Sequence, residues 1–528
     1  MIQRSTRASK TTFSLCVAAA AVALLCNPAA AADHDSDPAP DNARVIVKFK
    51  KGQKAVLKNL VAGLKGKVKH EIFNDDAMAI EVPRAVLQAL ENNPYVEFIE
   101  EDAKRYPLAL TTPSTGTPFA TGQLVPYGIK MVQADLLSDS AAANRKICII
   151  DSGYDRNHED LSANVATGEY DAGTGWWYTD ENHHGTHVAG TIAAINNSGK
   201  GVVGVNANAK IKLHIVKVFG ANGWAYSSSL ASAANKCKAA GANIISMSLG
   251  GPSQNNTEKN TFASLANAGI LNIAAAGNDG NTAVSYPAGY TSVISVGAVD
   301  ENKAWATFSQ YNSKVELAGP GVGVLSTVPM GSGQEAVLTV GASSYAPGAM
   351  TGSPVTTATA PLADFGIGDT VNAAVSGKVC LIQRGTVDFA TKVSNCQNSG
   401  GVGAIVYNNV AGAFGGTLGT VVTSIPSVTA TMADGTAMKG QFGQSATVGI
   451  KASNYAYFDG TSMATPHVAA VAALVWSYYP TCTAAQMRST LTKSALDLGT
   501  VGRDTKYGFG LVQAKAARDR IASLGCGN

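Results

Sequence analysis

The sequence carries little charge and has no long run of basic residues. Lysine, arginine, aspartate and glutamate make up only 15% of its 528 residues, and their formal net charge is +3. Proteins that bind nucleic acid usually concentrate basic residues on one face, so this sequence does not suggest a nucleic-acid partner. The low charged fraction and the 55 glycines are typical of a globular chain with several cores rather than of a disordered one.

Long apolar runs are also scarce, and the clearest one lies near the N-terminus. Basic residues among the first ten precede an apolar run at 13–26, and small residues follow at 29–32. The run is too short to span a bilayer comfortably, and the order is typical of a secretory signal peptide, which we place at 1–32. We therefore expect a secreted, extracellular protein with no membrane contact after signal removal. An uncleaved anchor helix is the alternative.

The sequence has no C-x-x-C pair, which argues against a zinc site. Two of its eight cysteines lie in the predicted signal peptide. The other six are Cys148, Cys237, Cys380, Cys396, Cys482 and Cys526. An even number in an oxidising compartment permits three disulfides, and fifteen connectivities are formally open.

A small lysine-rich unit follows the predicted signal peptide. Within residues 33–121, a polar linker leads into a core at 44–106, and a connector at 107–121 is rich in Thr, Ser, Pro and Gly. The residue pattern of the core predicts strands at 44–49, 77–82 and 95–99, and helices at 55–64 and 83–90. The composition of the connector predicts an exposed, cleavable segment.

From about residue 122 to 330, buried apolar strands alternate with helical segments. The expected strands are at 146–150, 211–218, 244–248, 272–276 and 293–299, and the expected helices are at 187–196, 227–240 and 261–268. Such alternation predicts an α/β fold of three layers, in which a mostly parallel central sheet has helices on both faces. Functional sites in such folds gather at the carboxyl ends of the strands.

A segment of different composition interrupts this pattern. Residues 331–455 are rich in Thr, Gly, Ala and Val and predict a β-rich inserted domain. The α/β pattern resumes over 456–528, where a long apolar helix is expected at 463–476 and further helices follow it.

Three short segments place acid–base groups at strand ends or helix starts. Asp151 follows a buried strand, His184 opens a helix, and Ser462 opens another. Serine is a poor nucleophile unless a base lies within hydrogen-bond reach, and imidazole suits that role because its pKa lies near neutrality. A carboxylate behind the imidazole stabilises its charged form. Taken singly, these residues could be a turn, a surface histidine and an N-cap; together they predict a catalytic triad.

These segments resemble the signatures of the subtilisin-like serine proteases, the subtilases. The matching residues are at 151–153, 184–187 and 460–464. The resemblance implies a serine endopeptidase with Asn278 as the side-chain donor to the oxyanion and the backbone N–H of Ser462 as the second donor. A turn role before Asp279 is the alternative for Asn278. The same chain order of Asp, His and Ser is known for subtilisin.

The resemblance also implies where the substrate lies. It would be an extended strand between two edges, Ser248-Leu249-Gly250 and Gly223-Trp224-Ala225, which gives little selectivity because the pairing uses the backbone. The primary pocket would be formed by 248–250, by Ala275, Ala276 and Gly277, and by Ser285 near its floor. Since no charge lies at this floor, we expect a broad or apolar preference. Trp224 would shape a more distant subsite or be a simple surface aromatic.

Calcium is the expected metal. His184 and His187 are three residues apart but lack the H-E-x-x-H pattern, so a structural role for His187 is favoured, as it is for His158, His183 and His467. The resemblance implies a structural Ca²⁺ site whose oxygen ligands suit a hard cation. The residues at those positions are Gln123, Asp160, Ile195, Asn197 and Val202.

The flanking pieces also resemble known domains. The core at 44–106 is similar to an inhibitor-type subtilase propeptide, with residues 97–102 expected near the cleft. The insert is similar to the protease-associated domain over 377–385, at Phe389, and over 392–393 and 403–409, which implies a lid or substrate-contacting role; an inert spacer is the alternative. On this division we expect the disulfides Cys380–Cys396, Cys482–Cys526 and Cys148–Cys237.

The resemblance implies a self-processing precursor with two kinds of partner. They are protein and peptide substrates and its own propeptide, which would act as intramolecular chaperone and inhibitor. We expect the enzyme to be a monomer. A catalytically dead binding protein of the same fold and a permanent N-terminal domain are alternatives, but no member of the triad is missing.

Overall fold

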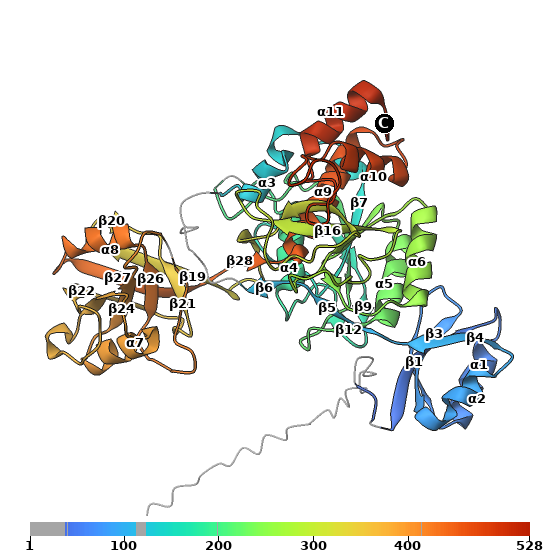
Figure 1. The fold of residues 1–528 in the computed structure, drawn as a ribbon, viewed down its shortest axis with the longest axis horizontal. Helices are drawn as coiled ribbons and strands as arrows, with labels where there is room; N and C mark the ends of the chain where they lie inside the picture. The colour runs from blue at the N-terminus through green and yellow to red at the C-terminus, as the bar shows by residue number, and fades with distance from the viewer. Residues whose placement is uncertain (1–36, 40, 112–122, 198, 413) are drawn as a thin grey trace, which may run out of the picture.

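The computed structural model describes residues 37–39, 41–111, 123–197, 199–412 and 414–528. The predicted signal peptide lies outside the described residues. Figure 1 shows a large central body with the N-terminal unit on one side and the insert on the other. No helix in the described ranges has the length and apolarity needed to cross a bilayer.

Seven parallel strands form the central sheet, in the order β17-β16-β15-β13-β7-β11-β8. Their bounds are β7 (Lys146–Asp151), β8 (Val165–Gly168), β11 (Lys212–Lys217), β13 (Ile244–Met247), β15 (Leu271–Ala275), β16 (Val293–Val299) and β17 (Val315–Pro320). Most are runs of Ile, Val and Ala that are buried throughout, as expected for a parallel sheet covered on both faces.

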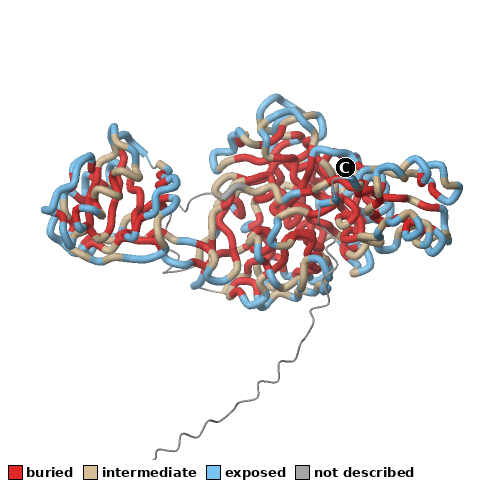
Figure 2. The backbone as a smooth tube through the Cα atoms, turned by 90° about the horizontal axis from the view of Figure 1, so that it is seen from below, coloured by how far each residue is buried: buried red, intermediate tan, exposed pale blue. Residues whose placement is uncertain are grey.

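Helices cover both faces of this sheet, so the predicted three-layer α/β fold is confirmed. On one face lie α4 (His184–Ala193) and α9 (Thr461–Tyr478), and on the other lie α5 (Ser227–Ala239) and α6 (Asn256–Asn267). Each face of the sheet has its own hydrophobic core, and residues of β7 alternate between them. Ile147 and Ile149 belong to the first core, with α4 and α9, whereas Cys148 and Ile150 belong to the second core, with α5. Figure 2 shows this buried interior as continuous through the central body.

The remaining helices and small strands surround the central layers. They are α3 (Tyr127–Met131), α10 (Ala484–Lys493), α11 (Ala514–Leu524), β9 (Tyr170–Asp171) and β10 (Gly175–Trp176). Helix α4 begins three residues earlier than the sequence predicted, and α9 begins two residues earlier, because each starts at a glycine-flanked polar segment rather than at its first apolar residue.

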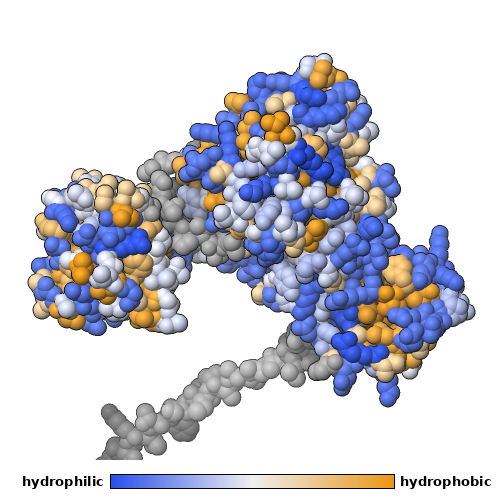
Figure 3. Space-filling view, viewed as in Figure 1, coloured by the Kyte–Doolittle hydropathy of each residue, from blue (hydrophilic) through white to orange (hydrophobic). Residues whose placement is uncertain are grey.

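The N-terminal unit is an antiparallel sheet covered by short helices. The strand order is β2-β3-β1-β4, with β1 (Asn42–Phe49), β2 (Lys67–Glu71), β3 (Ala77–Pro83), β4 (Val96–Glu101), α1 (Lys54–Gly63) and α2 (Leu87–Glu91). The sequence did not predict β2, since its lysine-rich residues are half-exposed and give no apolar alternation. Apolar residues are visible on the surface of this unit in Figure 3, as expected for a domain too small to bury most of its surface.

The chain leaves this unit and enters the central body as a paired strand. Strand β5 (Lys104–Pro107) lies between β12 (Ala225–Tyr226) and β14 (Leu249–Gly250), antiparallel to both. Next, β6 (Leu110–Thr111) pairs with β28 (Tyr455–Asp459), whose other edge pairs with β18 (Val324–Thr327). Residues 107, 110 and 111, which belong to the predicted exposed and cleavable connector, are thus paired with strands of the central body. Composition does not reveal such backbone pairing.

The insert is built on a nine-stranded mixed sheet. Its strand order is β20-β19-β27-β22-β23-β24-β26-β21-β25. The bounds are β19 (Gly333–Val340), β20 (Ser343–Ser344), β21 (Gly348–Thr351), β22 (Thr357–Asp364), β23 (Val379–Gln383), β24 (Gly403–Tyr407), β25 (Gly416–Thr417), β26 (Ser427–Ala430) and β27 (Ser445–Ser453), with α7 (Phe389–Asn398) and α8 (Met432–Lys439). Strands β19 and β27 pair along their length, so both ends of the insert leave at one place.

Three disulfides are present in the described residues. They join Cys148 to Cys237, Cys380 to Cys396, and Cys482 to Cys526. The first ties β7 to α5 inside the second core, and the other two close loops in the insert and around the C-terminal helices. These are the pairs expected from the division of the chain into domains.

Candidate active site

Asp151 and His184 form a buried pair at the carboxyl edge of the central sheet. Asp151 ends β7, and its Oδ1 accepts hydrogen bonds from His184 Nδ1 at 2.7 Å and from the Ser152 N–H at 2.7 Å. Both side chains are almost fully buried. Since Nδ1 is held by the carboxylate, Nε2 is left to exchange a proton. Among the described residues, no hydrogen-bond partner reaches this Nε2.

Asp180 holds the aspartate loop and the histidine helix together. Its Oδ1 accepts from Ser152 Oγ at 2.8 Å and from the His183 N–H at 2.9 Å. Its Oδ2 accepts from the N–H and the hydroxyl of Thr186, in the first turn of α4. The Ser152 hydroxyl in turn accepts from the Gly185 N–H at 2.8 Å. A carboxylate at a helix N-terminus is favoured by the helix dipole, so this network fixes where α4 starts.

Ser462 is the second residue of α9, immediately after β28 and Gly460. Its hydroxyl is fully buried and donates to the Ser248 carbonyl at 2.8 Å, while Ser248 Oγ donates to the Ser462 carbonyl at 2.8 Å. The structure therefore brings Asp151 and His184 into contact, whereas the Ser462 hydroxyl is engaged by Ser248. The hydroxyl must leave the Ser248 carbonyl before it can donate to His184.

A peptide carbonyl of the chain itself lies beside Ser462. The oxygen of Leu108 accepts from Asn278 Nδ2 at 2.7 Å and from the Ser462 N–H at 3.2 Å. The Leu108 N–H donates to the Ser248 carbonyl at 3.3 Å. Two donors at one carbonyl oxygen, next to a serine at a helix N-terminus, can stabilise negative charge that develops on that oxygen.

Thr461 fixes the orientation of the Asn278 amide. The N–H and the hydroxyl of Thr461 both lie within hydrogen-bond distance of Asn278 Oδ1, at 2.9 and 2.8 Å. Because Oδ1 accepts from Thr461, the amide nitrogen must face Leu108. Gly460 leaves the space for this approach, since a Cβ there would lie 2.4 Å from the Leu108 oxygen.

Strand β5, which leads to Leu108, contacts both of the edges between which the resemblance placed a substrate. Leu249 and Gly250 pair with Pro107 and Tyr106, and Ala225 pairs with Arg105.

The other residues that the resemblance assigned to the substrate site include Gly223, Trp224 and residues 275–277. The Lys104 ammonium lies 4.1 Å from the centre of the Trp224 ring, and Gly223 precedes that ring in a left-handed turn with φ of 70°. Ala275 and Ala276 are buried at the end of β15, and the Gly277 N–H donates to the Thr461 hydroxyl at 3.2 Å.

Two of the other histidines are buried structural groups. His187 stacks on Phe458 with ring centres 4.3 Å apart and its Nε2 faces two backbone carbonyls. Burial, and to a smaller extent the neighbouring His184, lowers the pKa of His187 to about 3. Burial lowers the pKa of His467 to about 4. Both therefore stay neutral at ordinary pH.

The five residues expected to hold calcium lie together. Gln123 Nε2 lies 2.8 Å from the Ile195 carbonyl, 3.4 Å from Asn197 Oδ1 and 3.3 Å from the Val202 carbonyl. The Asp160 carboxylate accepts from Asn197 Nδ2 and from the Val202 N–H. Three oxygens thus converge on one amide, and an amide can present oxygen in place of nitrogen by a half-turn. The donor set fits a hard cation.

Sequence reasoning missed several residues of this site. Asp180 and Thr461 orient other residues of the site, and a sequence motif identifies only the residues that they orient. Leu108 was missed because the segment expected near the cleft was 97–102. That segment instead reaches α5 and α6: Glu100 accepts from the backbone of Asn256 and Thr257. The cleft is occupied by the residues that follow.

Comparison with family models agrees with this geometry. The model described as "Subtilase family" matches residues 142–358 and 394–510, more than half of the chain. The model "PA domain" matches 347–438, and "Fervidolysin N-terminal prodomain" matches 28–102.

Individual relatives agree as well. The chain is 38% identical over 271 residues to "Alkaline protease" of Alkalihalobacillus alcalophilus, covering 49% of this chain and 64% of that protein. It is 34% identical over 299 residues to "Subtilisin E" of Bacillus subtilis (strain 168), covering 55% and 74%. The crystal structure of the psychrophilic subtilisin-like protease Apa1 from Pseudoalteromonas sp. AS-11 matches with a TM-score of 0.63 and 44% identity, over 77% of this chain and 100% of that one. The chain therefore belongs to the subtilase family, and it carries an N-terminal prodomain and an inserted PA domain.

Proposed function

We propose that this subtilase is a secreted serine endopeptidase that cleaves proteins through an acyl-enzyme at Ser462. The observation that carries the proposal is the Leu108 carbonyl, which lies between the amide of Asn278 and the N–H of Ser462. This is the position that a peptide carbonyl must take before a serine attacks it. The predicted signal peptide and the three disulfides support secretion, since disulfides persist in oxidising compartments.

The first half of the reaction forms the acyl-enzyme. Ser462 Oγ leaves the Ser248 carbonyl, gives its proton to His184 Nε2 and bonds to the carbonyl carbon. The negative charge that develops on the carbonyl oxygen is held by Asn278 Nδ2 and the Ser462 N–H, while Asp151 stabilises the charged imidazole. The C–N bond then breaks, and the proton on His184 passes to the leaving amine.

The second half releases the product and restores the serine. A water molecule gives a proton to His184 Nε2 and attacks the acyl carbon, and the same two donors hold the oxyanion. The ester bond to Ser462 Oγ breaks, and the proton returns from His184 to that oxygen.

The chain is its own first substrate in this proposal. With the Leu108 carbonyl in place, the bond to be cut is Leu108–Ala109, so the mature enzyme would begin at Ala109. The prodomain is held for this step by two carboxylates at helix starts: the half-buried Glu100 accepts from the first turn of α6, and the buried Asp102 accepts from Ser227 and Ser228 at the start of α5. These contacts support its role as intramolecular chaperone and inhibitor.

The residue before the cleaved bond, P1, is expected to be apolar, within a broad specificity. A Cβ on Gly250 would lie 2.2 Å from Ser285 Oγ and 2.9 Å from a methyl carbon of Leu108, so the leucine side chain lies against this wall. No charged side chain belongs to the set proposed for this pocket.

Covalent labelling tests the proposal directly. A peptidyl phosphonate with leucine at P1 should label Ser462 of the mature enzyme, as mapped by mass spectrometry of its peptides. His184→Ala should abolish labelling, because the serine then has no base. Labelling of another residue, or equal labelling in the His184→Ala protein, would refute the mechanism.

We further propose a structural Ca²⁺ held by the side chains of Gln123, Asp160 and Asn197 and by the carbonyls of Ile195 and Val202. Burial raises the pKa of Asp160, and a bound cation would compensate that desolvation. The ion would tie residue 123, close to the mature N-terminus, to the loop after α4.

Removal of calcium is expected to lower the melting temperature of the mature enzyme by about 3 °C. An ion present at 100 times its Kd stabilises by about 2.7 kcal/mol, and each kcal/mol shifts a protein of about 420 residues by about 1 °C, because the entropy of unfolding grows with chain length. Calorimetry with and without a chelator measures the shift. Asp160→Asn should lose most of it, whereas Asp369→Asn, the same change at an exposed position in the insert, should keep it. A melting temperature that the chelator leaves unchanged would contradict the proposed Ca²⁺ site.

A further inference from the structure

The chain segment in the cleft defines the subsites of this protein. Taking Leu108 as P1, the preceding residues are Pro107 at P2, Tyr106 at P3 and Arg105 at P4. The side chains alternate as in any strand: Tyr106 is 42% exposed, whereas Arg105 is fully buried. Arg105 is also the largest fully buried side chain of the described residues. A buried arginine that belongs to a segment destined for removal needs a partner on the enzyme.

Glu258, on α6 of the catalytic domain, is that partner. Its Oε1 accepts from Arg105 Nε at 3.0 Å and its Oε2 from Arg105 Nη2 at 2.7 Å, which is the two-pronged pairing that a guanidinium makes with a carboxylate. Both side chains have no exposed surface. Two further donors are used as well, because Nη2 also donates to the Ser253 carbonyl at 3.0 Å and Nη1 donates to the Lys104 carbonyl at 2.9 Å.

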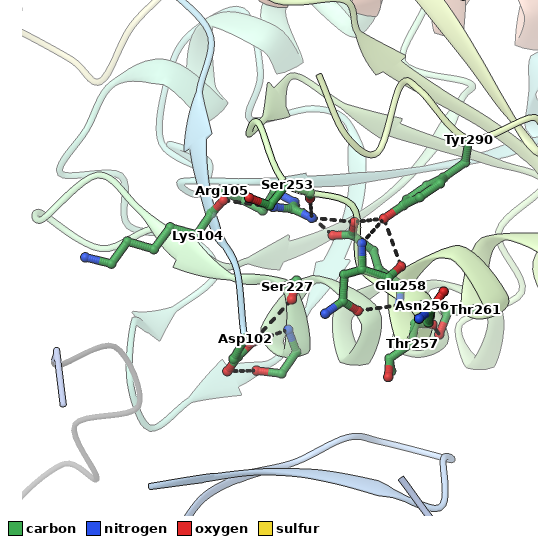
Figure 4. Close-up of polar contacts among 12 residues, drawn as sticks. Asp102, Lys104, Arg105, Ser227, Ser253, Asn256, Thr257, Glu258, Thr261 and Tyr290 are labelled. Carbon is green, nitrogen blue, oxygen red and sulfur yellow. Dashed lines mark hydrogen bonds and ion pairs between the residues drawn. The ribbon is translucent and has the colours of Figure 1, made fainter. Parts of the chain in front are cut away.

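The enzyme itself orients the Glu258 carboxylate. Figure 4 shows Tyr290 and Arg105 meeting at this carboxylate, and the Tyr290 hydroxyl lies 2.8 Å from Oε2. Asn255 anchors both groups: its Oδ1 accepts from the Glu258 N–H at 3.0 Å, and its N–H donates to the Tyr290 hydroxyl at 2.9 Å. Glu258 also lies in the first turn of α6, where the helix dipole favours a negative charge. None of these contacts involves the prodomain, so the carboxylate stays in place when the prodomain leaves.

Space and charge in this pocket both favour a long cation. A Cβ on Gly251 would lie 2.4 Å from the Lys104 carbonyl and 3.1 Å from Arg105 Nη1, so the glycine leaves room for the side chain. Burial alone would lower the pKa of Arg105, but the Glu258 carboxylate more than offsets this and raises it, so the guanidinium stays charged. A neutral side chain in the same place would bury an unpaired carboxylate, which is costly.

We propose that Glu258, oriented by Tyr290 and Asn255, makes the P4 subsite of this enzyme select arginine in protein substrates. The inference rests on the proposed endopeptidase function and narrows it: the P1 pocket accepts apolar residues broadly, and P4 supplies the charge selectivity. Lysine is a weaker P4 residue than arginine, because a single ammonium cannot make the two parallel hydrogen bonds.

Matched peptides test the selectivity on the mature wild-type enzyme. The pair is acetyl-Arg-Tyr-Pro-Leu-p-nitroanilide and the same peptide with citrulline, which has the shape of arginine without its charge. We expect kcat/KM for the arginine peptide to be at least about 30-fold higher, because a buried charge left unpaired costs 2 kcal/mol or more. Equal values for the two peptides would overturn the P4 proposal and leave the endopeptidase function standing. If neither peptide, nor a protein substrate such as casein, is cleaved, the endopeptidase function itself fails.

Glu258→Gln tests the residue. The ratio of kcat/KM between the arginine and citrulline peptides should fall to near one, while Glu301→Gln, the same change at an exposed position, should keep the wild-type ratio. Glu258→Gln also leaves Arg105 of the prodomain without its buried partner, which could impair maturation. The Arg105→Gln/Glu258→Gln double variant avoids this, because both side chains are then neutral, and it yields the same mature Glu258→Gln enzyme once the prodomain is removed. A ratio that stays high in the Glu258→Gln enzyme would overturn the assignment of Glu258.

Discussion

Ser462→Ala is expected to yield a precursor in which the Leu108–Ala109 bond stays intact. The Leu108 carbonyl already lies at the two donors, Asn278 Nδ2 and the Ser462 N–H, and the substitution keeps both while removing the only oxygen that can attack. The prodomain should therefore remain covalently attached and docked. Intact-mass measurement and N-terminal sequencing check this: the wild-type protein should begin at Ala109, whereas the variant should retain the prodomain.

Ser477→Ala is the matched control for this experiment. Ser477 lies on the same helix, α9, and is also buried, but its hydroxyl donates to the Leu474 carbonyl far from the cleft. The Ser477→Ala protein should mature at the same bond as the wild type. A Ser462→Ala protein found cut at Leu108–Ala109 after expression in a protease-deficient host and purification would show that another protease processes the precursor.

The expectation of a single cut follows from how the strand is held. Residues 104–107 pair on both sides with enzyme strands, and residues 110 and 111 pair with β28. Because both flanks are fixed, only one carbonyl reaches the two donors. We expect the same pairing to make the cleaved N-terminal product an inhibitor, since it keeps β5, the Arg105–Glu258 pair and the helix contacts of Glu100 and Asp102.

Much of the fold could be predicted because the central strands are continuous apolar runs. In β7, β15 and β16 both faces are covered, so length and apolarity alone identify them. Strands β5, β6, β12 and β14 have only two to four residues each. They form by pairing between distant segments, β5 with β12 and β14, and β6 with β28. No periodicity can identify such short strands, and the path of the prodomain through the cleft was missed for this reason.

The site shows a similar division. Asp151, His184 and Ser462 occur in glycine-flanked signatures, because the backbone must approach closely there: a Cβ on Gly153 would lie 1.9 Å from the Thr179 carbonyl. Asp180, Glu258 and Tyr290 lie outside the signatures, and their roles depend on contacts between distant segments. The expectation of broad specificity came from backbone pairing of the substrate and from the P1 pocket, where no charge was found; the charge proposed to select the P4 residue belongs to Glu258 on α6.

The role of the insert stays a prediction. Its two ends leave the catalytic domain beside the loop that follows Asp151: the Met330 N–H donates to Asp155, and Asn454 donates to Glu159. The strand that follows the insert, β28, pairs with residues 110 and 111 and leads directly to Ser462. A movement of the insert would therefore shift β28, the strand that pairs with the residues after the cleaved bond. This agrees with a lid or substrate-contacting domain.

Asn278→Ala is expected to lower kcat by about 100- to 1000-fold with little change in KM. This is the range known for loss of one oxyanion-hole donor in subtilisin. The hydrogen bond from Nδ2 becomes charge-assisted when the oxyanion forms, so its loss is felt mainly in the transition state. Steady-state kinetics, with active enzyme counted by phosphonate titration, measure the effect. Asn281→Ala, in the same loop but exposed and turned to the Ala283 N–H, should behave as the wild type. A loss confined to KM would contradict the oxyanion role.

Thr461→Val extends this test to the group that orients the amide. Valine keeps the shape of threonine and the N–H that donates to Asn278 Oδ1 at 2.9 Å, but it removes the hydroxyl at 2.8 Å. With one of its two anchors gone, the amide spends part of its time misaligned, and we expect a loss in kcat of about fivefold, since a net hydrogen bond contributes about 1 kcal/mol. Because Thr461 is argued to act only through Asn278, the Asn278→Ala/Thr461→Val double variant should be no slower than Asn278→Ala alone. Additive losses would mean that Thr461 supports catalysis by another route, such as its hydrogen bond from the Gly277 N–H.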